Sequence, residues 1–295
     1  MTWGELCDPE GLTARNRPRC IPPRSKFFPT FYVVAPVYKL FACTIHKSMT
    51  MLLTAIMCYL SDSDMFIQAD KKLATEVQYT RFCEGRNEFN RLTIAKENMS
   101  MNGWASYDWS MFAITRDPVD RFLSGFLDLC VRTNSDCHGC GANLTCFLEN
   151  TYRRAMALTL EDNSTLREQV ITPKENWTYH QFQLDPLDLH IFPQHWRCEF
   201  DKNFASYKKV RYSSDPMKTL WPDMQSIFEK AGVPKAKLDY IKSEITSTRT
   251  VHSTVQYKAR KYIEKRLRSS PYLMELLVRL FYYDYKFFNW QLPEL

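Results

Sequence analysis

The stretch CTIHKSMTMLL, residues 43–53, joins two apolar segments, and it decides which fold the chain can adopt. The segment before it, residues 38–43, has the composition of a buried strand. The segment after it, residues 51–60 (MLLTAIMCYL), is apolar on every face and predicts a buried helix. A strand that passes into a helix through a short turn is the unit from which α/β folds are built, and Lys47 lies in that turn.

The turn itself has the chemistry of an anion site. The first backbone N–H groups of a helix have no intrahelical partner and carry the positive end of the helix dipole. Lys47 would add a positive charge, and Ser48 and Thr50 would add hydroxyl donors. A simpler interpretation remains open at this point: Ser48 or Thr50 only caps the helix, and Lys47 is solvated.

A second turn of the same kind lies further along the chain. Residues 109–115 (WSMFAIT) predict a strand, Arg116 follows it, and residues 119–131 have helical periodicity after Pro118. Two such units in succession predict an α/β fold with a central parallel β-sheet flanked by helices. Because ligands bind at the carboxyl ends of parallel strands, we expect Arg116 and the Lys47 turn to open on the same edge of the sheet.

The composition limits the remaining possibilities. With 295 residues, of which 45% are hydrophobic and 14% aromatic, the chain can bury a large core and is neither disordered nor fibrous. Its net charge of +6 is too small to predict a nucleic-acid partner, although it is compatible with a polyanionic ligand. We expect an extended N-terminal arm over residues 1–30, rich in Pro, Arg and Gly, and one domain over residues 31–295.

The cysteine content points to an oxidising compartment. Ten cysteines are many for a cytosolic enzyme, and several fall in a loop-like insertion near residues 130–150, where disulfides would hold the chain. Zinc is the alternative, because Cys137 and Cys140 have the spacing of a metal knuckle, although no second pair follows at finger spacing. Four N-glycosylation sequons favour a lumenal or secreted glycoprotein, and they begin at Asn98, Asn143, Asn163 and Asn176.

Such a location requires a targeting segment, and the printed sequence offers none. Residues 1–30 have no apolar core of signal-peptide length. The longest uninterrupted apolar run, residues 51–60, is half of what a membrane span needs. We therefore expect that an N-terminal piece is missing from this chain.

Two motifs together resemble those of a known family. Residues 46–52 (HKSMTML) resemble the 5′-phosphosulfate loop of sulfotransferases that use 3′-phosphoadenosine 5′-phosphosulfate, and residues 112–126 (FAITRDPVDRFLSGF) are similar to their 3′-phosphate motif. The resemblance extends from about residue 36 to the C-terminus and is closest to the Golgi carbohydrate sulfotransferases, in particular the nematode group similar to chondroitin 4-O-sulfotransferase. Two positions depart from the family pattern: His46 stands where many relatives have Pro, and Met49 where many have Gly.

The resemblance implies a P-loop-like sulfotransferase fold and a role for each motif residue. Lys47 would be the catalytic cation that stabilises negative charge on the departing nucleotide. The donor would be 3′-phosphoadenosine 5′-phosphosulfate, and no metal would be needed. The acceptor would be a chondroitin-like glycosaminoglycan in the Golgi lumen, and a full-length form would be anchored in the membrane. The residues that would bind the donor are Lys47, Ser48, Met49, Thr50, Met51, Arg116 and Ser124.

A sugar hydroxyl also needs a general base within hydrogen-bond reach. No histidine lies between Lys47 and Arg116, the segment from which several sulfotransferases take their base, so we place His190 first. Together with Asp188, His190 resembles part of an aspartate-glutamate-histidine-tryptophan element of related carbohydrate sulfotransferases. His252 could instead belong to a loop that closes over the nucleotide. The other candidates for the base are His195, Glu97 and Asp108.

Two other functions and two basic segments remain open. A catalytically inactive glycan-binding relative would keep the fold and lose turnover, whereas a P-loop kinase is disfavoured because no GxxxxGK loop precedes Ser48. If the acceptor is a polyanionic glycan, either basic segment, residues 208–211 or residues 258–268, could guide it by charge. The sequence leaves the oligomeric state open.

Overall fold

The computed structural model describes most of the chain and divides it into two compact units. One unit contains the β-sheet, comprises residues 27–117 and 197–255, and is called the sheet unit. The other contains helices, comprises residues 1–26, 118–196 and 256–295, and is called the helical unit. The described residues are 2–7, 19–24, 26–76, 81–101, 103, 109–162, 184–247 and 257–294.

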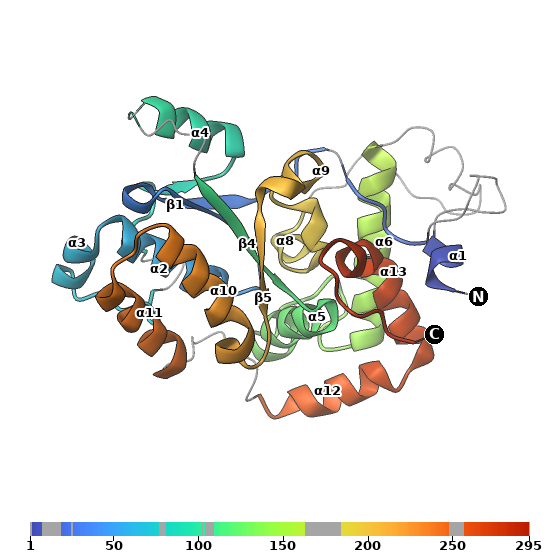
Figure 1. Ribbon diagram of the computed structural model, residues 1–295. Coiled ribbons are helices and arrows are strands. Elements are labelled where there is room, and N and C mark those ends of the chain that lie inside the picture. Colours follow the sequence, from blue (N-terminus) through green and yellow to red (C-terminus); the bar gives the residue numbers. More distant parts are fainter. Residues whose placement is uncertain are drawn as a thin grey trace. The chain divides into compact units, whose positions relative to one another are not determined.

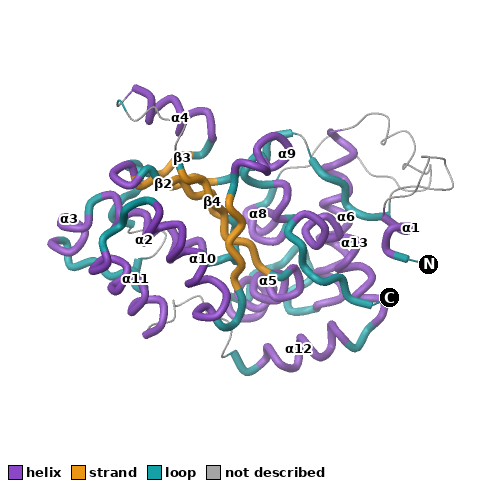
Figure 2. The backbone as a smooth tube through the Cα atoms, in the orientation of Figure 1, coloured by secondary structure: helices purple, strands orange, loops and turns teal. Residues whose placement is uncertain are grey.

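The sheet unit is built on a five-stranded sheet with the strand order β3-β1-β2-β4-β5. Figure 2 shows its strands in orange. Strands β2, β4 and β5 are parallel, whereas β1 pairs antiparallel with both β2 and β3. The predicted α/β architecture with a central sheet flanked by helices is therefore confirmed, and its parallel part consists of β2, β4 and β5. The strands are β1 (Phe31–Ala35), β2 (Leu40–Thr44), β3 (Glu88–Phe89), β4 (Ser110–Arg116) and β5 (Lys208–Tyr212).

The core of the sheet unit lies between one face of the sheet and three helices. Every second residue of the central strands faces this core, as Leu40 and Ala42 of β2 and Phe112 and Ile114 of β4 do. Residues 52–60 of α2 are buried at every position and pack into the same core. Figure 1 shows the three helices grouped beside the sheet, and burial of their apolar surface stabilises the unit. They are α2 (Thr50–Ser61), α10 (Pro216–Lys230) and α11 (Lys235–Ser247).

Two disulfides cross-link the sheet unit. Cys43, near the carboxyl end of β2, is bonded to Cys198, and Cys58 of α2 is bonded to Cys83. The first bond fixes the strand that leads into the Lys47 turn, which ties the position of this turn to a distant part of the sequence. Figure 2 shows α4 beyond the edge strand β3. The other helices of this unit are α3 (Ser63–Gln68), α4 (Leu92–Met101) and α9 (Phe200–Asn203).

The helical unit packs around a cluster of aromatic rings. Phe122 of α5 stacks against Phe126 and against Phe147 of α6, and it contacts Phe281 of α13. The predicted helix after Arg116 is present: α5 begins at Pro118 and continues beyond its α-helical part as a π-helix over Leu127–Arg132. The helices of this unit are α1 (Trp3–Cys7), α5 (Pro118–Phe126), α6 (Leu144–Asp162), α8 (Pro186–Ile191), α12 (Ala259–Arg268) and α13 (Pro271–Phe287).

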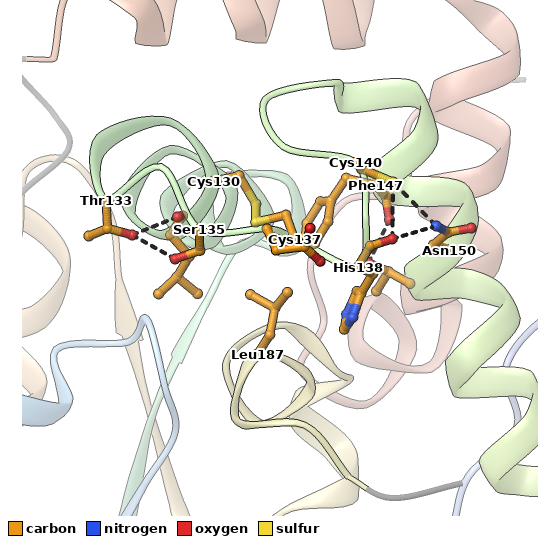
Figure 3. Close-up of a disulfide and its surroundings, with 12 residues drawn as sticks. Cys130, Thr133, Ser135, Cys137, His138, Cys140, Phe147, Asn150 and Leu187 are labelled. Atoms are coloured by element: carbon orange, nitrogen blue, oxygen red, sulfur yellow. Dashed lines mark hydrogen bonds between the residues drawn. A yellow bond between two sulfur atoms is a disulfide. The ribbon is translucent and has the colours of Figure 1, made fainter. Parts of the chain in front are cut away.

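The cysteine-rich loop between α5 and α6 is held by two disulfides, Cys130–Cys137 and Cys140–Cys146. Figure 3 shows the first of these bonds, with Leu187 of α8 pointing toward it. The predicted disulfides of this loop are confirmed. Because both cysteines of the supposed metal knuckle are oxidised in these bonds and zinc binds thiolates, the zinc alternative at this position is wrong.

The described parts of the two chain ends contact each other within the helical unit. Cys7 and Cys20 form a disulfide, and the indole N–H of Trp3 donates to the carbonyl oxygen of Pro293 at 2.8 Å. Among the described helices, none is both long enough and apolar enough to cross a bilayer.

Candidate functional site

The turn between β2 and α2 contains the predicted anion-binding residues. β2 ends at Thr44, and α2 begins at Thr50 with Met49 as its N-cap residue. Lys47 and Met49 have φ angles of 66° and 60°, in the left-handed region that residues other than glycine seldom adopt. Strained residues of this kind persist only where the surrounding structure holds them, and they cluster at functional sites.

Neither Ser48 nor Thr50 caps α2, so the capping part of the simpler interpretation is wrong. Met49 makes no capping hydrogen bond, and the Thr50 hydroxyl donates instead to the carbonyl oxygen of Ile45 at 2.8 Å. The first intrahelical bond runs from the Leu53 N–H to the Met49 carbonyl oxygen at 2.9 Å. The amides of Thr50 and Met51 precede this bond and have no partner inside the helix, so the dipole of α2 favours an anion at the turn.

Ser48 has a feature that is typical of a ligand-binding position. Its side chain is fully buried, and its backbone N–H donates to the carbonyl oxygen of Ile45 at 3.0 Å. Within the described part of the chain, the Ser48 Oγ has no hydrogen-bond partner. A buried polar group without a partner costs about 1–3 kcal/mol, so native proteins seldom keep one unless another group binds it. The turn therefore fits an anion that accepts a hydrogen bond from Ser48.

Arg116 connects the end of β4 to this turn. Its Nη1 donates to the carbonyl oxygen of Lys47 at 3.0 Å, and its side chain is buried. The guanidinium lies over the ring of Tyr212, 5.0 Å from the ring centroid, and Tyr212 is the register partner of Arg116 in β5. Because β2, β4 and β5 are parallel, their carboxyl ends bring Lys47, Arg116 and Tyr212 to one edge of the sheet.

The two methionines of the motif, Met49 and Met51, have no side-chain hydrogen-bond donor for an anion at this edge. Met49 packs against the hydrophobic core of the sheet unit, so its side chain is turned toward the core. The sulfotransferase motif that this segment resembles often has glycine at this position. Met51 is half-buried in the first turn of α2. Any hydrogen bonds that Met49 and Met51 make to an anion would therefore come from their backbone amides.

In the helical unit, α5 contains two buried polar residues, Ser124 and Arg121. Ser124, the predicted phosphate ligand, is 7% exposed and lies eight positions after Arg116 in the sequence. Arg121 was not predicted as a site residue, although an arginine on the apolar face of a predicted helix was a signal for it. Its guanidinium is buried and donates to the carbonyl oxygens of His190 at 3.1 Å, Ile191 at 2.6 Å and Phe192 at 2.7 Å. Arg121 thus fixes the backbone of this segment.

His190, the first candidate for the base, lies in the last turn of α8. Its Nδ1 lies 2.8 Å from the carbonyl oxygen of Pro186, which can only accept a hydrogen bond. The neutral ring therefore carries its proton on Nδ1, and Nε2 is the nitrogen with the basic lone pair. This tautomer suits a general base that accepts a proton at Nε2.

His195, the second candidate, belongs to a buried pair with Asp284 of α13. Its Nδ1 lies 2.7 Å from Oδ1 of Asp284, and the carboxylate also accepts the backbone N–H groups of Gln194 and His195. Burial alone would raise the pKa of Asp284, but the hydrogen bond from His195 and the nearby charge of Arg121 hold that pKa below its usual value. His195 is 3% exposed, and its buried Nε2 has no hydrogen-bond partner among the described residues, so His195 stays an alternative for the base.

The side chain of Asp188 makes an ion pair and hydrogen bonds within the helical unit. It is buried, it pairs with Arg154 at 2.5 Å, and its carboxylate lies 3.4 Å from Nε2 of His138. It also accepts the backbone N–H of Asp185 and so completes the capping box of α8. Burial opposes ionisation, but the hydrogen bonds from Arg154 and His138 hold the pKa of Asp188 below its usual value.

The remaining candidates for the base are less constrained. Glu97 lies on the exposed side of α4 in the sheet unit. Asp108 and His252 lie outside the described residues, as do the sequons at Asn163 and Asn176. Among the residues that the structure describes, no group of three or more His, Cys, Asp or Glu side chains could hold a metal ion.

Comparison with known proteins gives a consistent result. The profile of the sulfotransferase family matches residues 30–291. Three relatives come from Caenorhabditis elegans. An "Uncharacterized protein" is 37% identical over 90% of this chain and 70% of the relative. "Putative sulfotransferase vep-2" is 30% identical over 87% of this chain and 76% of the relative, and "Carbohydrate sulfotransferase chst-1" is 28% identical over 88% of this chain and 74% of the relative. No solved structure gave a significant match.

Proposed function

Because the chain belongs to the sulfotransferase family, we propose that it transfers a sulfuryl group from 3′-phosphoadenosine 5′-phosphosulfate to a hydroxyl group of a chondroitin-like glycosaminoglycan. The observation that carries the proposal is the buried Ser48 hydroxyl without a partner, in a turn whose backbone Arg116 holds. The similarity to a protein named as a carbohydrate sulfotransferase supports a carbohydrate acceptor. We assign the activity to residues 31–295, with the cysteine-rich loop as an insertion.

The donor would bind at the carboxyl edge of the sheet. The Ser48 hydroxyl and the amides of Met49, Thr50 and Met51 would donate to the 5′-phosphosulfate group, which is the usual way a helix N-terminus binds a phosphate. Arg116, with Ser124, would bind the 3′-phosphate, because a guanidinium matches phosphate oxygens in charge and geometry.

Lys47 would stabilise the charge that develops during transfer. The donor supplies a sulfuryl group whose bond to the 5′-phosphate oxygen breaks as sulfur bonds to the sugar oxygen. A cation fixed beside the departing oxygen lowers the barrier, provided that it does not have to reorganise. The left-handed backbone of Lys47 and the hydrogen bond from Arg116 to its carbonyl oxygen restrict this part of the chain before any donor binds.

His190 would accept the proton of the sugar hydroxyl at Nε2. We expect His190→Gln to lower kcat by roughly 10²–10⁴-fold with little loss of stability, because general base catalysis contributes about that much. His195→Gln is the matched variant, and we expect it to lower the unfolding temperature instead, because it removes a buried partner of Asp284. An unchanged kcat in His190→Gln would exclude His190 and leave His195 and Glu97 as the next candidates.

The disulfides support a location in an oxidising compartment. Five disulfides include all ten cysteines, a pattern that is rare in the cytosol. We propose the Golgi lumen, with a membrane anchor in a full-length form and N-glycans at sequons such as Asn143, which is exposed.

The proposal is tested by incubating the protein with donor carrying a labelled sulfuryl group and a panel of desulfated glycosaminoglycans, followed by disaccharide analysis. Incorporation into chondroitin is the expected result, and the position of the label identifies the hydroxyl group that is modified. Incorporation into another glycan alone would overturn the chondroitin assignment. Binding of 3′-phosphoadenosine 5′-phosphate without transfer to any glycan would identify an inactive glycan-binding relative.

A further inference from the structure

Helix α12 carries a concentration of positive charge that the reaction described above does not use. Residues 258–268 contain six basic side chains and one glutamate, in a chain whose whole net charge is only +6. An ordinary solvated helix face mixes both signs of charge, whereas this one is almost entirely basic. The structure shows which of these charges serve the fold.

One side of α12 is used to attach the helix within the helical unit. Arg260 forms an ion pair with Asp120 of α5, and Glu264 pairs with Arg260 and with Arg268. Leu267 on the same side is fully buried. These contacts hold α12 in one orientation and leave its opposite side to face solvent.

The solvent side has three lysines in a row. Lys258, Lys261 and Lys265 are spaced by three and four residues, which places them on one face of the helix. All three are exposed, and among the described residues none of them has an ion-pair partner. Tyr262 lies on the same side and is 66% exposed. The helix therefore presents a face of uncompensated positive charge with an aromatic ring beside it.

The other basic segment does not present its charges in this way. Lys208 and Lys209 are consecutive residues of β5, so their side chains point to opposite faces. The ammonium of Lys209 donates to the carbonyl oxygen of Phe204 at 3.3 Å and lies 4.2 Å from the centroid of its ring. Of the two segments that the sequence left open, only α12 forms a continuous exposed basic face.

We propose that the face formed by Lys258, Lys261, Tyr262 and Lys265 is a docking surface for an extended anionic polysaccharide, an inference that rests on the proposed function because that polymer is the acceptor chain. Lys258 and Lys265 are about 10 Å apart along the helix axis. A linear polymer with regularly repeated carboxylate or sulfate groups can therefore contact all three ammonium groups at once, and each flexible lysine can follow its own charge.

The composition of the helix favours a polysaccharide over an anionic membrane. A helix that binds in the membrane interface needs an apolar face to bury beside its basic one. On α12 no large aliphatic side chain is exposed, and the apolar Leu267 is buried within the protein. Charge without an exposed aliphatic face matches a hydrated polyanion.

The test compares Lys258→Gln/Lys261→Gln/Lys265→Gln with wild type in binding a fluorescent chondroitin chain, without donor, at about 0.1 M salt, where exposed charges still act over about 10 Å. We expect the triple variant to bind at least tenfold more weakly, because three exposed charge contacts to the polymer are lost. The matched control, Lys72→Gln/Lys230→Gln/Lys242→Gln, removes three exposed lysines from the sheet unit. The affinity of this control should stay within about twofold of wild type. Lys258→Arg/Lys261→Arg/Lys265→Arg keeps all three charges and should also bind like wild type.

Several results would overturn the inference. Equal weakening by the α12 variant and by the control would mean that net charge alone matters. No binding by wild type, or loss of binding to anionic vesicles with unchanged binding to chondroitin, would also contradict it. The outcome is separable from that of the proposed function: wild type that binds chains through α12 without transferring sulfuryl groups supports the surface and not the activity. Transfer to chains with the same KM in wild type and triple variant supports the activity and not the surface.

Discussion

Met49 has a backbone conformation that its side chain does not favour. Its φ and ψ angles are 60° and 23°, and its side chain packs against the core of the sheet unit. A left-handed conformation costs a residue with a Cβ atom about 1–2 kcal/mol, and glycine does not incur this cost. The packing of the methionine offsets part of the strain, which explains how the turn keeps its shape without glycine.

This strain predicts an unusual order of stability. We expect Met49→Gly to be more stable than Met49→Ala by about 1 kcal/mol, because both lose the packing and only alanine keeps the strain. Met65, an exposed methionine of α3, is the control, and there alanine should be the more stable replacement by about 1 kcal/mol. Urea unfolding of the four variants measures both differences. A Met49→Gly variant less stable than Met49→Ala would show that the turn is not left-handed in solution.

The residues of the site were predictable to different degrees. Lys47, Ser48 and Arg116 follow from the sequence because they occupy strand-to-helix turns, and parallel strands place such turns on one edge. Tyr212 was not predicted, because its contact with Arg116 depends on the register between β4 and β5. The left-handed backbone of Lys47 could not be predicted either, since the local composition contains no glycine to signal it.

At the scale of elements, the two strand-to-helix units were easier to predict than the segments around them. The strand predicted over residues 109–115 and the helix after it correspond to β4 and α5. Strand β1 was missed although it is as long as β2, because it turns back into β2 through Pro36–Tyr38, a segment whose apolar pattern is interrupted. The pairing of His195 with Asp284 was also missed, because it links α13 to a segment far from it in sequence.

The contact between α13 and residues 194–195 predicts a pH-dependent stability. The pKa values of Asp284 and Asp188 are lower in the folded protein than in the unfolded chain. The two carboxylates therefore contribute fully to folding stability above the unfolded pKa of about 3.9, and this contribution is lost as the pH falls through their lower folded pKa values. We expect the free energy of unfolding to fall below about pH 4. Denaturant unfolding over the acid range measures this fall.

Asp284→Asn isolates one part of that dependence. We expect it to cost about 1–3 kcal/mol at neutral pH, because the buried carboxylate accepts three hydrogen bonds that an amide matches only in part, and to make the acid dependence shallower. Asp239→Asn removes an exposed carboxylate paired with Lys235 and should cost less than about 1 kcal/mol. An acid dependence in Asp284→Asn as steep as in wild type would contradict the assignment.

At the scale of the whole molecule, the disulfides differ in how much of the chain they close. Cys43–Cys198 joins residues 155 apart, whereas Cys140–Cys146 joins residues 6 apart. In the chain-entropy model a disulfide that closes a longer loop removes more conformational entropy from the unfolded state. For these two loop lengths, the predicted stabilisation differs by about 3 kcal/mol. We expect Cys43→Ser/Cys198→Ser to lose about 3 kcal/mol more stability than Cys140→Ser/Cys146→Ser. Equal losses, measured by denaturant unfolding, would contradict the model.

The central claim is that the Lys47 turn is the site of sulfuryl transfer, and the turnover of Lys47→Ala tests it most directly. With donor and chondroitin both saturating, we predict a loss of about 3–4 kcal/mol of transition-state stabilisation, roughly 10²–10³-fold in kcat. Lys72→Ala, which removes an exposed lysine of the same unit, should keep the wild-type kcat. A Lys47→Ala protein that binds the donor and turns over as fast as wild type would contradict the account.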